Sequence, residues 1–435
     1  MGILDLGRRW FSICVAAGSL TACGGSQPSI RAPSATTQAN DNASSLFQVL
    51  HRFGRHAEGG AVPQSPLLNF NGTLYGTTLW SHPCHHHGCG NGTVFSITKT
   101  GLKKVLYNFK GGIADGAQPI GPLIDVNGTL YGTTEQGGGS GCDGRGCGTI
   151  YSLSTSGSEK VLHSFEGGSD GAEPNGVIDV NGTLYGTTSL GGSGVNCGGS
   201  VDTPGCGTVY SISTSGSETV LHAFAGIPDG ALPNAALIDV NGTLYGTTGS
   251  GGVECGTQSI TFTQGCGTVY SITTSGSENV LYRFKGHRLA AVIPVGGLLD
   301  IHGMLYGTTS SGFAAGSVYK ISLSGAHKIV YYFRGIPDGA LPSGGLISVN
   351  GLLYGTTQSG GVACMKSTDR GCGTVFSVTT GGSETVLHSF TGGSIGAYPH
   401  ALTDINNTLY GTTESGGYPA PGCDAGCGIV FSLTI

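Results

Sequence analysis

The chain has 435 residues and a formal net charge of −6, and only 10% of its residues are charged. A nucleic-acid-binding protein presents a basic face, which this composition excludes, so we expect neither DNA nor RNA as a partner. The 82 glycines and 17 prolines recur at fixed places in a repeat. They are therefore turn residues rather than a mark of disorder.

Residues 1–22 predict an export signal, because Arg8 and Arg9 precede an apolar stretch over residues 10–20. The string L-T-A-C, which ends at Cys23, resembles the lipobox of bacterial lipoproteins. That resemblance implies a lipid on Cys23 and an anchor in the bacterial cell envelope, facing the periplasm or the cell exterior. An ordinary secretory signal cut nearby stays open, as does twin-arginine export. Residues 23–45 hold almost nothing that could form a core, and we expect a flexible tether.

The string L-Y-G-T-T occurs seven times over residues 46–435, at spacings of 48 to 61 residues. Its tyrosines are Tyr75, Tyr131, Tyr185, Tyr245, Tyr306, Tyr354 and Tyr410. A Gly- and Thr-rich period of this length without helical periodicity predicts a β-propeller or a β-solenoid. The length of each unit favours four strands per repeat.

Residues 174–224 illustrate one unit. Val177–Val180 and Thr183–Thr188 flank an Asn-Gly pair, which is a strong hairpin signal. Gly207–Thr214 and Thr219–Phe224 follow, separated by a Ser-Gly-Ser turn. The unit is thus predicted to form four antiparallel strands.

The two ends of the propeller region complete each other. The segment Ile429–Ile435 reads as a third strand with no fourth strand after it, whereas Phe47–Phe53 matches the fourth strands but precedes the first repeat. We therefore expect the N-terminal strand to close the last blade, which removes the open sheet edges of a linear stack. The prediction is an all-β, seven-bladed β-propeller.

The repeat resembles the GloVer tandem-repeat family, whose unit runs L-Y-G-T-T, a Gly-rich loop, G-T-V-F-S-I, S-G-S-E, V-L-x-x-F and D-G-A-x-P. The resemblance covers residues 47–435 and implies a propeller without an established activity. A more distant similarity to NHL-type repeats rests on the apolar run, the turn and the G-x-L-Y hairpin.

Strand direction places all the long connections on one rim of such a propeller, and this loop rim is where we expect binding. The exposed candidates for contact lie in the connections between second and third strands: Trp80, Arg145, Phe262, Arg370 and Tyr418. Each could instead merely cover its own loop.

The same connections carry cysteines in local pairs, and an even count in an exported chain predicts disulfides rather than metal sites. The expected pairs are Cys84–Cys89, Cys142–Cys147, Cys197–Cys206, Cys255–Cys266, Cys364–Cys372 and Cys423–Cys427. The fifth blade has no pair.

Three further groups of polar residues have a functional and a structural interpretation. His82, His85, His86 and His87 could hold a transition metal, although adjacent loop histidines more often bind weakly and adventitiously. The Asp-Gly-Ala aspartates could bind Ca²⁺ or a sugar, although Asp before Gly also suits a turn. The fourth-strand histidines alternate with tyrosines and are expected to be half-buried rings at the blade edge. We expect no cofactor.

The residue that follows each proline of the connection into the next blade should lie near the mouth of the central channel. These residues are Gln64, Ile120, Asn175, Asn234, Val295, Ser343 and His400. One histidine without an acid makes a poor catalytic site. The leading hypothesis is a monomeric, non-catalytic binding or scaffold module for a protein, peptide or glycan. The alternative is a cell-envelope hydrolase or lyase that uses His400, or a metal on the His82 loop, at the channel mouth.

Overall fold

The structure is a computed structural model that describes residues 47–54, 59–82, 89–194, 197, 205–255, 265–285, 292–310, 315–364, 370–420 and 423–435. The predicted signal, Cys23 and the whole of the predicted tether therefore lie outside the described residues. Ser45–Ile435 form one compact unit. None of the described helices has the length and apolar character needed to cross a membrane.

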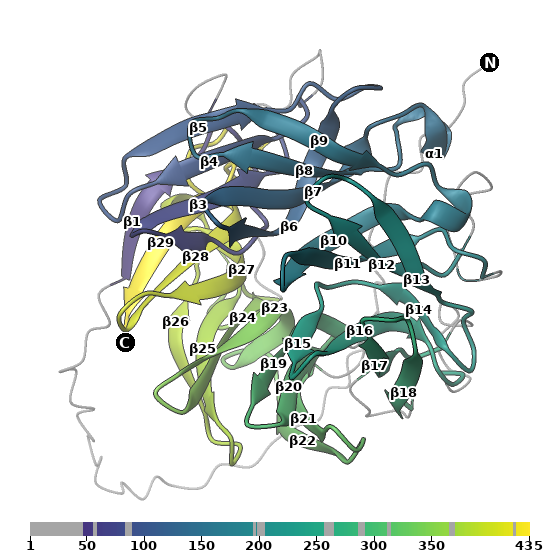
Figure 1. The fold of residues 1–435 in the computed structure, drawn as a ribbon. Helices are drawn as coiled ribbons and strands as arrows, with labels where there is room; N and C mark the ends of the chain where they lie inside the picture. The colour runs from purple at the N-terminus through teal and green to yellow at the C-terminus, as the bar shows by residue number, and fades with distance from the viewer. Residues whose placement is uncertain are drawn as a thin grey trace, which may run out of the picture. The chain divides into compact units, whose positions relative to one another are not determined.

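Seven antiparallel sheets form the blades of a β-propeller, which confirms the predicted fold class (Figure 1). Blade 1 contains β2 (Leu68–Phe70), β3 (Thr73–Thr78), β4 (Thr93–Ile97) and β5 (Lys103–Asn108). Blade 2 contains β6 (Gly116–Val126), β7 (Thr129–Gly137), β8 (Thr149–Ser154) and β9 (Glu159–Ser164). Blade 3 contains β10 (Ala172–Val180), β11 (Thr183–Leu190), β12 (Thr208–Ser213) and β13 (Glu218–Ala223).

The remaining blades repeat this order. Blade 4 contains β14 (Gly230–Pro233), β15 (Ile238–Val240), β16 (Thr243–Gly251), β17 (Thr268–Thr273) and β18 (Glu278–Arg283). Blade 5 contains β19 (Pro294–Ile301), β20 (Met304–Thr309), β21 (Ser317–Ser322) and β22 (His327–Tyr332). Blade 6 contains β23 (Gly339–Val349), β24 (Leu352–Gly360), β25 (Thr374–Thr379) and β26 (Glu384–Ser389). Blade 7 contains β27 (Ala397–Asp404), β28 (Thr408–Ser415), β29 (Ile429–Thr434) and β1 (Phe47–Arg52).

The ring closes as expected, because β1 pairs antiparallel with β29. Phe47 lies opposite Leu433 and Arg52 lies opposite Ile429. The backbone N–H of Phe53 extends the pairing by donating to the carbonyl of Gly428 at 3.0 Å. Figure 1 shows the purple N-terminal strand beside the yellow C-terminal strands.

The innermost strand of blade 3 is longer than the sequence predicted. In blade 3 the strand begins at Ala172 instead of Val177, with a register shift between Pro174 and Val177. Proline has no N–H to donate, so a strand that contains one is interrupted locally and resumes beyond it. In blade 4 the same interruption divides the inner strand into β14 and β15, and both pieces pair with β16.

The L-Y-G-T-T string holds each blade together and joins it to the next. In blade 3, Leu184 is fully buried in the core, and Thr188 Oγ1 hydrogen-bonds Thr208 Oγ1 on the neighbouring strand at 2.8 Å. Thr187 Oγ1 donates to the carbonyl of Ala235 in blade 4 at 3.1 Å. A buried hydroxyl without a hydrogen-bond partner would destabilise the fold. These hydrogen bonds therefore allow threonine at the buried positions of the motif.

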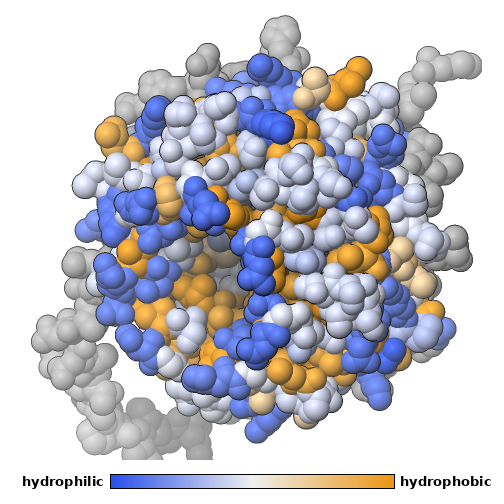
Figure 2. All heavy atoms as spheres, viewed as in Figure 1, coloured by the Kyte–Doolittle hydropathy of each residue, from blue (hydrophilic) through white to orange (hydrophobic). Residues whose placement is uncertain are grey.

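The described residues form seven hydrophobic core clusters, one at each seam between neighbouring blades. Between blades 3 and 4, for example, Phe224 packs with Leu237 and Tyr270. Each blade therefore depends on both neighbours for the burial of its faces. Figure 2 shows that the surface is hollowed near the middle of the ring. Hydrophobic and hydrophilic residues are interspersed around the hollow.

Candidate functional site

The loop rim is built on five described disulfides, as predicted. They join Cys142 to Cys147, Cys197 to Cys206, Cys255 to Cys266, Cys364 to Cys372, and Cys423 to Cys427. Their Cα–Cα distances of 5.0 to 5.4 Å are ordinary for this bond. Cys84 of the sixth expected pair lies outside the described residues. The disulfides indicate an oxidising, extracytoplasmic compartment.

The second cysteine of each described pair also contacts the following blade. The carbonyl of Cys206 accepts a hydrogen bond from the N–H of Leu232 at 2.8 Å, and the carbonyl of Cys427 accepts one from Val62 at 2.8 Å. In blade 5, which has no disulfide, the carbonyl of Ala315 takes this role toward Leu341 at 2.7 Å. The contact between blades is thus a property of the fold, and the disulfide constrains the loop from which it comes.

Paired glycines bring the two ends of each cysteine loop together. Gly426 has a φ of +91°, and a Cβ on it would lie 2.1 Å from the carbonyl oxygen of Gly416. No side chain fits there, and the left-handed φ also favours glycine. The loops of the rim therefore start from rigid, closely packed bases.

The described contact candidates come from four consecutive blades. Arg370 of blade 6 and Arg145 of blade 2 are exposed, and Tyr418 of blade 7 is 38% exposed. Trp80 of blade 1 is half-buried and packs on the core cluster that contains Phe53. The four side chains follow one arc of the rim, whereas Phe262 lies outside the described residues.

Three of the seven predicted channel-mouth residues link neighbouring blades through their side chains. Asn175 Nδ2 donates to the carbonyl of Pro233 at 2.9 Å, and Asn234 Nδ2 donates to that of Pro294 at 2.7 Å. The hydroxyl of Ser343 donates to the carbonyl of Pro399 at 2.6 Å. These polar groups are used by the fold and are not free to act on a ligand.

His400 differs from the other channel-mouth residues. Its side chain is only 13% exposed, and its Nε2 lies 3.9 Å from Glu414 Oε2. Burial lowers the pKa of His400 to about 4 and raises that of Glu414. Sequence reasoning missed Glu414, which directly follows the last L-Y-G-T-T string and was assigned no role. The structure thus supplies an acid beside the predicted histidine.

Only one of the four histidines of the proposed metal loop can be placed. His82 is described, and its backbone N–H donates to the carbonyl of Cys89 at 3.4 Å. His85, His86 and His87 lie outside the described residues, so the predicted metal site on this loop stays a prediction.

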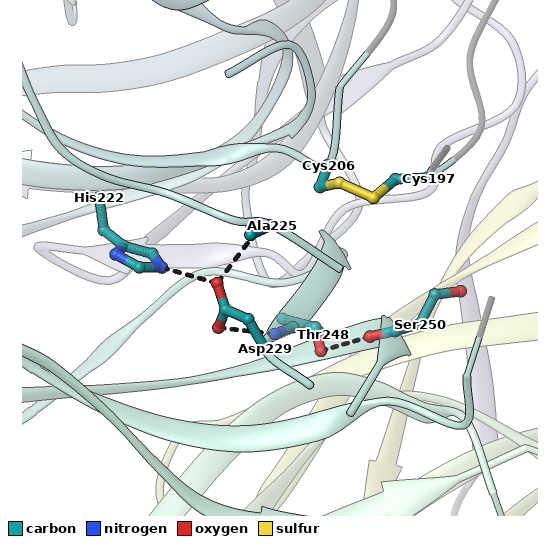
Figure 3. Close-up of a disulfide and its surroundings, with 8 residues drawn as sticks. Cys197, Cys206, His222, Ala225, Asp229, Thr248 and Ser250 are labelled. Atoms are coloured by element: carbon teal, nitrogen blue, oxygen red, sulfur yellow. Dashed lines mark hydrogen bonds and ion pairs between the residues drawn. A yellow bond between two sulfur atoms is a disulfide. The ribbon is translucent and has the colours of Figure 1, made fainter. Parts of the chain in front are cut away.

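The Asp-Gly-Ala aspartates stabilise turns, as the structural interpretation predicted. Asp229 accepts hydrogen bonds from the N–H groups of Ala225 at 3.0 Å and Gly230 at 2.7 Å (Figure 3). The same carboxylate also contacts His222 Nε2 at 3.2 Å. Asp170 contacts His163 Nε2 at 3.2 Å in the same way. Two of the half-buried histidines at the blade edge, His163 and His222, are therefore bound to the turn aspartates.

A glutamate from the next blade faces each of these aspartates. Glu218 belongs to the cluster with His163 and Asp170, and Glu278 belongs to that with His222 and Asp229. In two other seams a tyrosine takes the place of the histidine. Tyr107 Oη donates to Asp115 at 2.9 Å and Tyr331 Oη donates to Asp338 at 2.9 Å, beside Glu159 and Glu384 respectively.

The environment of these carboxylates shifts their proton affinity. Burial, together with the facing aspartate, raises the pKa of Glu159, Glu218, Glu278 and Glu384 to about 7. Burial also opposes the charge of His163, but Asp170 and Glu218 outweigh that effect and raise its pKa. Four half-buried acidic pairs therefore lie between the blades.

The other three seams have neither member of the acidic pair. There the Asp is replaced by Gly59, Ala290 and Ile395, and the Glu by Lys103, His327 and Phe47. His327 stacks on Tyr282 with ring centroids 4.2 Å apart. Lys103 Nζ donates to the carbonyl of Gly59 and lies 5.4 Å from the ring centroid of Phe53.

Sequence reasoning did not identify the facing glutamates. The signal was present, because each of the four Asp-Gly-Ala connections is followed in the next repeat by a G-S-E turn, which reads S-G-S-E in three repeats and G-G-S-E in the fourth. That turn was assigned only as a link between the third and fourth strands. The correlation becomes meaningful once the start of each fourth strand is known to lie beside the end of the preceding blade's fourth strand, as Glu218 lies beside His163 and Asp170.

Solved structures align with most of this chain only at low sequence identity. A luciferin-regenerating enzyme is 13% identical with a TM-score of 0.41, over 90% of this chain and 95% of its own. Sqt1 of Saccharomyces cerevisiae is 12% identical with a TM-score of 0.48, over 83% and 82%. Likenesses this distant say nothing about activity. The curated protein sequences contain no match.

The repeat itself is recognised over nearly the whole propeller. The family model described as the Gloeobacter/Verrucomicrobia repeat matches residues 38–258, 193–361 and 251–435. These stretches overlap and together include all seven blades. The family resemblance expected from the L-Y-G-T-T units is thereby confirmed, and the chain belongs to the Gloeobacter/Verrucomicrobia repeat family.

Proposed function

We propose that this propeller is a non-catalytic binding or scaffold module whose loop rim engages a protein, peptide or glycan of the cell envelope. The observation that carries the proposal is the arc of Arg370, Tyr418, Trp80 and Arg145 on four consecutive blades. Arginine and aromatic side chains are the types that dominate binding surfaces. Rigid, disulfide-closed loops would present them at a small cost in conformational entropy.

The channel mouth supports the same choice. Asn175, Asn234 and Ser343 are committed to carbonyl groups of the next blade. A catalytic propeller needs polar side chains that converge on a substrate rather than on its own backbone. Recognition through the loops is therefore favoured over chemistry in the middle of the ring.

The remainder of the proposal concerns location. We propose that a lipid on Cys23 and a tether over residues 23–45 hold a monomeric propeller at the membrane surface. A Cys23→Ser chain should then move from the membrane fraction to the soluble fraction. Mass spectrometry of the mature N-terminus gives the second readout, and an unmodified N-terminus on a membrane-bound chain would contradict the anchor.

The binding proposal is tested by sedimenting the full chain with cell envelopes of its own source. The variant R145A/R370A/Y418A removes three exposed side chains of the arc. The matched control K99A/L102A removes exposed side chains from the turn between β4 and β5, on the opposite rim. We expect at least a roughly tenfold loss of affinity for the first variant, since hot-spot side chains each contribute 1 kcal/mol or more, and none for the control. Equal binding by both variants would exclude the loop rim.

A hydrolase or lyase is the second candidate, and His400 beside Glu414 is the observation that favours it. The Nε2 of His400 is buried without a hydrogen-bond partner among the described residues. Such a group could act as a base toward a substrate that enters the channel. The full chain should be assayed with ester, lactone and uronide substrates beside H400Q and E414Q. Activity lost in both variants would establish this candidate, and activity retained in both would remove it.

A further inference from the structure

We propose that the chain binds two divalent transition-metal ions of the zinc type between its blades. One site would use His163, Asp170 and Glu218 between blades 2 and 3. The other would use His222, Asp229 and Glu278 between blades 3 and 4. In each cluster the three ligand atoms lie within 4.8 Å of one another.

The facing carboxylates are the first argument. Glu218 Oε1 and Glu278 Oε1 are buried, and neither has a hydrogen-bond partner among the described residues. Each shares its cluster with an aspartate, so two acidic groups meet where solvent is partly excluded. A buried charge needs a compensating partner, and a cation placed between the two carboxylates would supply one.

The ligand chemistry is the second argument. Imidazole nitrogen combined with carboxylate oxygen suits Zn²⁺ and similar ions, whereas Ca²⁺ and Mg²⁺ prefer oxygen ligands alone. Three protein ligands leave a fourth position for water. In both clusters the aspartate already accepts backbone N–H groups, which orients its carboxylate before an ion arrives.

The chain contains its own comparison. Between blades 1 and 2, and between blades 5 and 6, the same acidic pairs face Tyr107 and Tyr331 instead of histidine. Each phenol donates a hydrogen bond to the aspartate and offers no imidazole nitrogen. We therefore assign metal binding to the two histidine seams and not to the two tyrosine seams.

The two sites differ in their surroundings. Arg283 acts electrostatically on Glu278, and its Nε donates to the carbonyl of Pro228 at 2.7 Å. Glu166 lies close enough to act on His163, which adds negative charge at the first site. A neighbouring cation repels a metal ion and a neighbouring anion attracts it. The site between blades 2 and 3 should accordingly bind more tightly.

The test is a Zn²⁺ titration of the full, oxidised chain by calorimetry after removal of metal with a chelator. Metal content after dialysis gives the stoichiometry independently. The parent for all variants carries His82→Asn, His85→Asn, His86→Asn and His87→Asn, which removes binding by the loop histidines. We expect two equivalents for the parent, one for H163Y and none for H163Y/H222Y, which converts both seams to the tyrosine type.

Two matched double variants test whether the glutamates of the histidine seams are ligands. E218Q/E278Q removes one ligand from each site with little change in shape and should weaken both sites at least tenfold. E159Q/E384Q makes the same change at the tyrosine seams and should leave two equivalents. Melting temperatures in chelator verify that every variant is folded. No binding by the parent, or two equivalents retained by H163Y/H222Y or by E218Q/E278Q at unchanged affinity, would overturn the proposal.

Discussion

Phe47 lies flat against His388, with ring centroids 3.9 Å apart and an angle of 4° between the ring planes. Phe47 is the first residue of β1, whereas His388 belongs to β26 of blade 6. The N-terminal strand therefore has two contacts that close the ring: its backbone pairs with β29 inside blade 7, and its first side chain packs on blade 6. Burial at this seam lowers the pKa of His388 to about 4, so the imidazole is neutral at pH 7.

Replacement of Phe47 by Ala should destabilise the propeller by about 2 kcal/mol, less than a fully buried phenylalanine because this ring is half-buried. The midpoint of urea unfolding measures the effect. A double-mutant cycle with His388→Ala should yield a coupling of about 0.5–1.5 kcal/mol for the stacked pair. Additive effects of the two substitutions would show that the stack contributes nothing of its own.

Removal of a rim disulfide should lower stability without loss of the fold. For Cys197→Ala/Cys206→Ala we expect a loss of about 2–3 kcal/mol, because a short loop is released in the unfolded chain. The hydrogen bond from Leu232 to the carbonyl of residue 206 needs no sulfur and should persist. Thermal unfolding with and without a reductant provides the measurement, and the wild type under reducing conditions should fall below this variant. A variant as stable as the oxidised wild type would contradict the expectation.

Tyr210→Phe should leave the propeller equally stable or stabilise it by up to about 1 kcal/mol. The hydroxyl of Tyr210 is fully buried and has no hydrogen-bond partner among the described residues. Phe95, Phe376 and Phe431 occupy the corresponding position in three other blades, which shows that the ring alone satisfies the packing. The control is Tyr107→Phe, which removes a hydroxyl bonded to Asp115 and should destabilise. Destabilisation by Tyr210→Phe in urea unfolding would point to a partner for its hydroxyl.

The contribution of the four inter-blade glutamates to stability should decrease as the pH rises from about 5 to about 8, whereas the buried histidines with a lowered pKa act in the opposite direction up to about pH 6.5. Burial and Asp115 raise the pKa of Glu159 to about 7, above its ordinary value of 4.5. The folded state therefore holds this proton more tightly than the unfolded state, and the advantage is complete below pH 4.5 and lost as the pH passes 7. Glu218, Glu278 and Glu384 contribute in the same direction.

Melting temperatures measured in chelator between pH 5 and pH 8 test this dependence. Glu159→Gln resembles the protonated acid at every pH. It should therefore remove the contribution of Glu159 to the pH dependence of the melting temperature. The control Glu254→Gln changes an exposed acid and should leave the slope unchanged. A slope that is identical in wild type and Glu159→Gln would contradict the assignment to the inter-blade carboxyls.

Local sequence patterns predicted much of the candidate site. The cysteine pairs lie 4 to 11 residues apart at corresponding places of each repeat, and five of them form the predicted disulfides. The Asp-Gly turns were identified because an aspartate in that context bonds to nearby backbone. By contrast, Glu414 beside His400 and Glu218 beside His163 escaped prediction, since nothing in the chain near either histidine marks its partner.

The amino-acid sequence by itself determined seven blades of four strands and their closure by β1. Hairpins and strand alternation are set by residues only a few positions apart, and a fourth strand placed before the first repeat leaves a ring as the consistent solution. Only the tertiary structure decided which side chains meet at the seams. The twist of each sheet and the angle between blades bring Glu278 to Asp229 and Phe47 to His388, and no local pattern specifies that geometry.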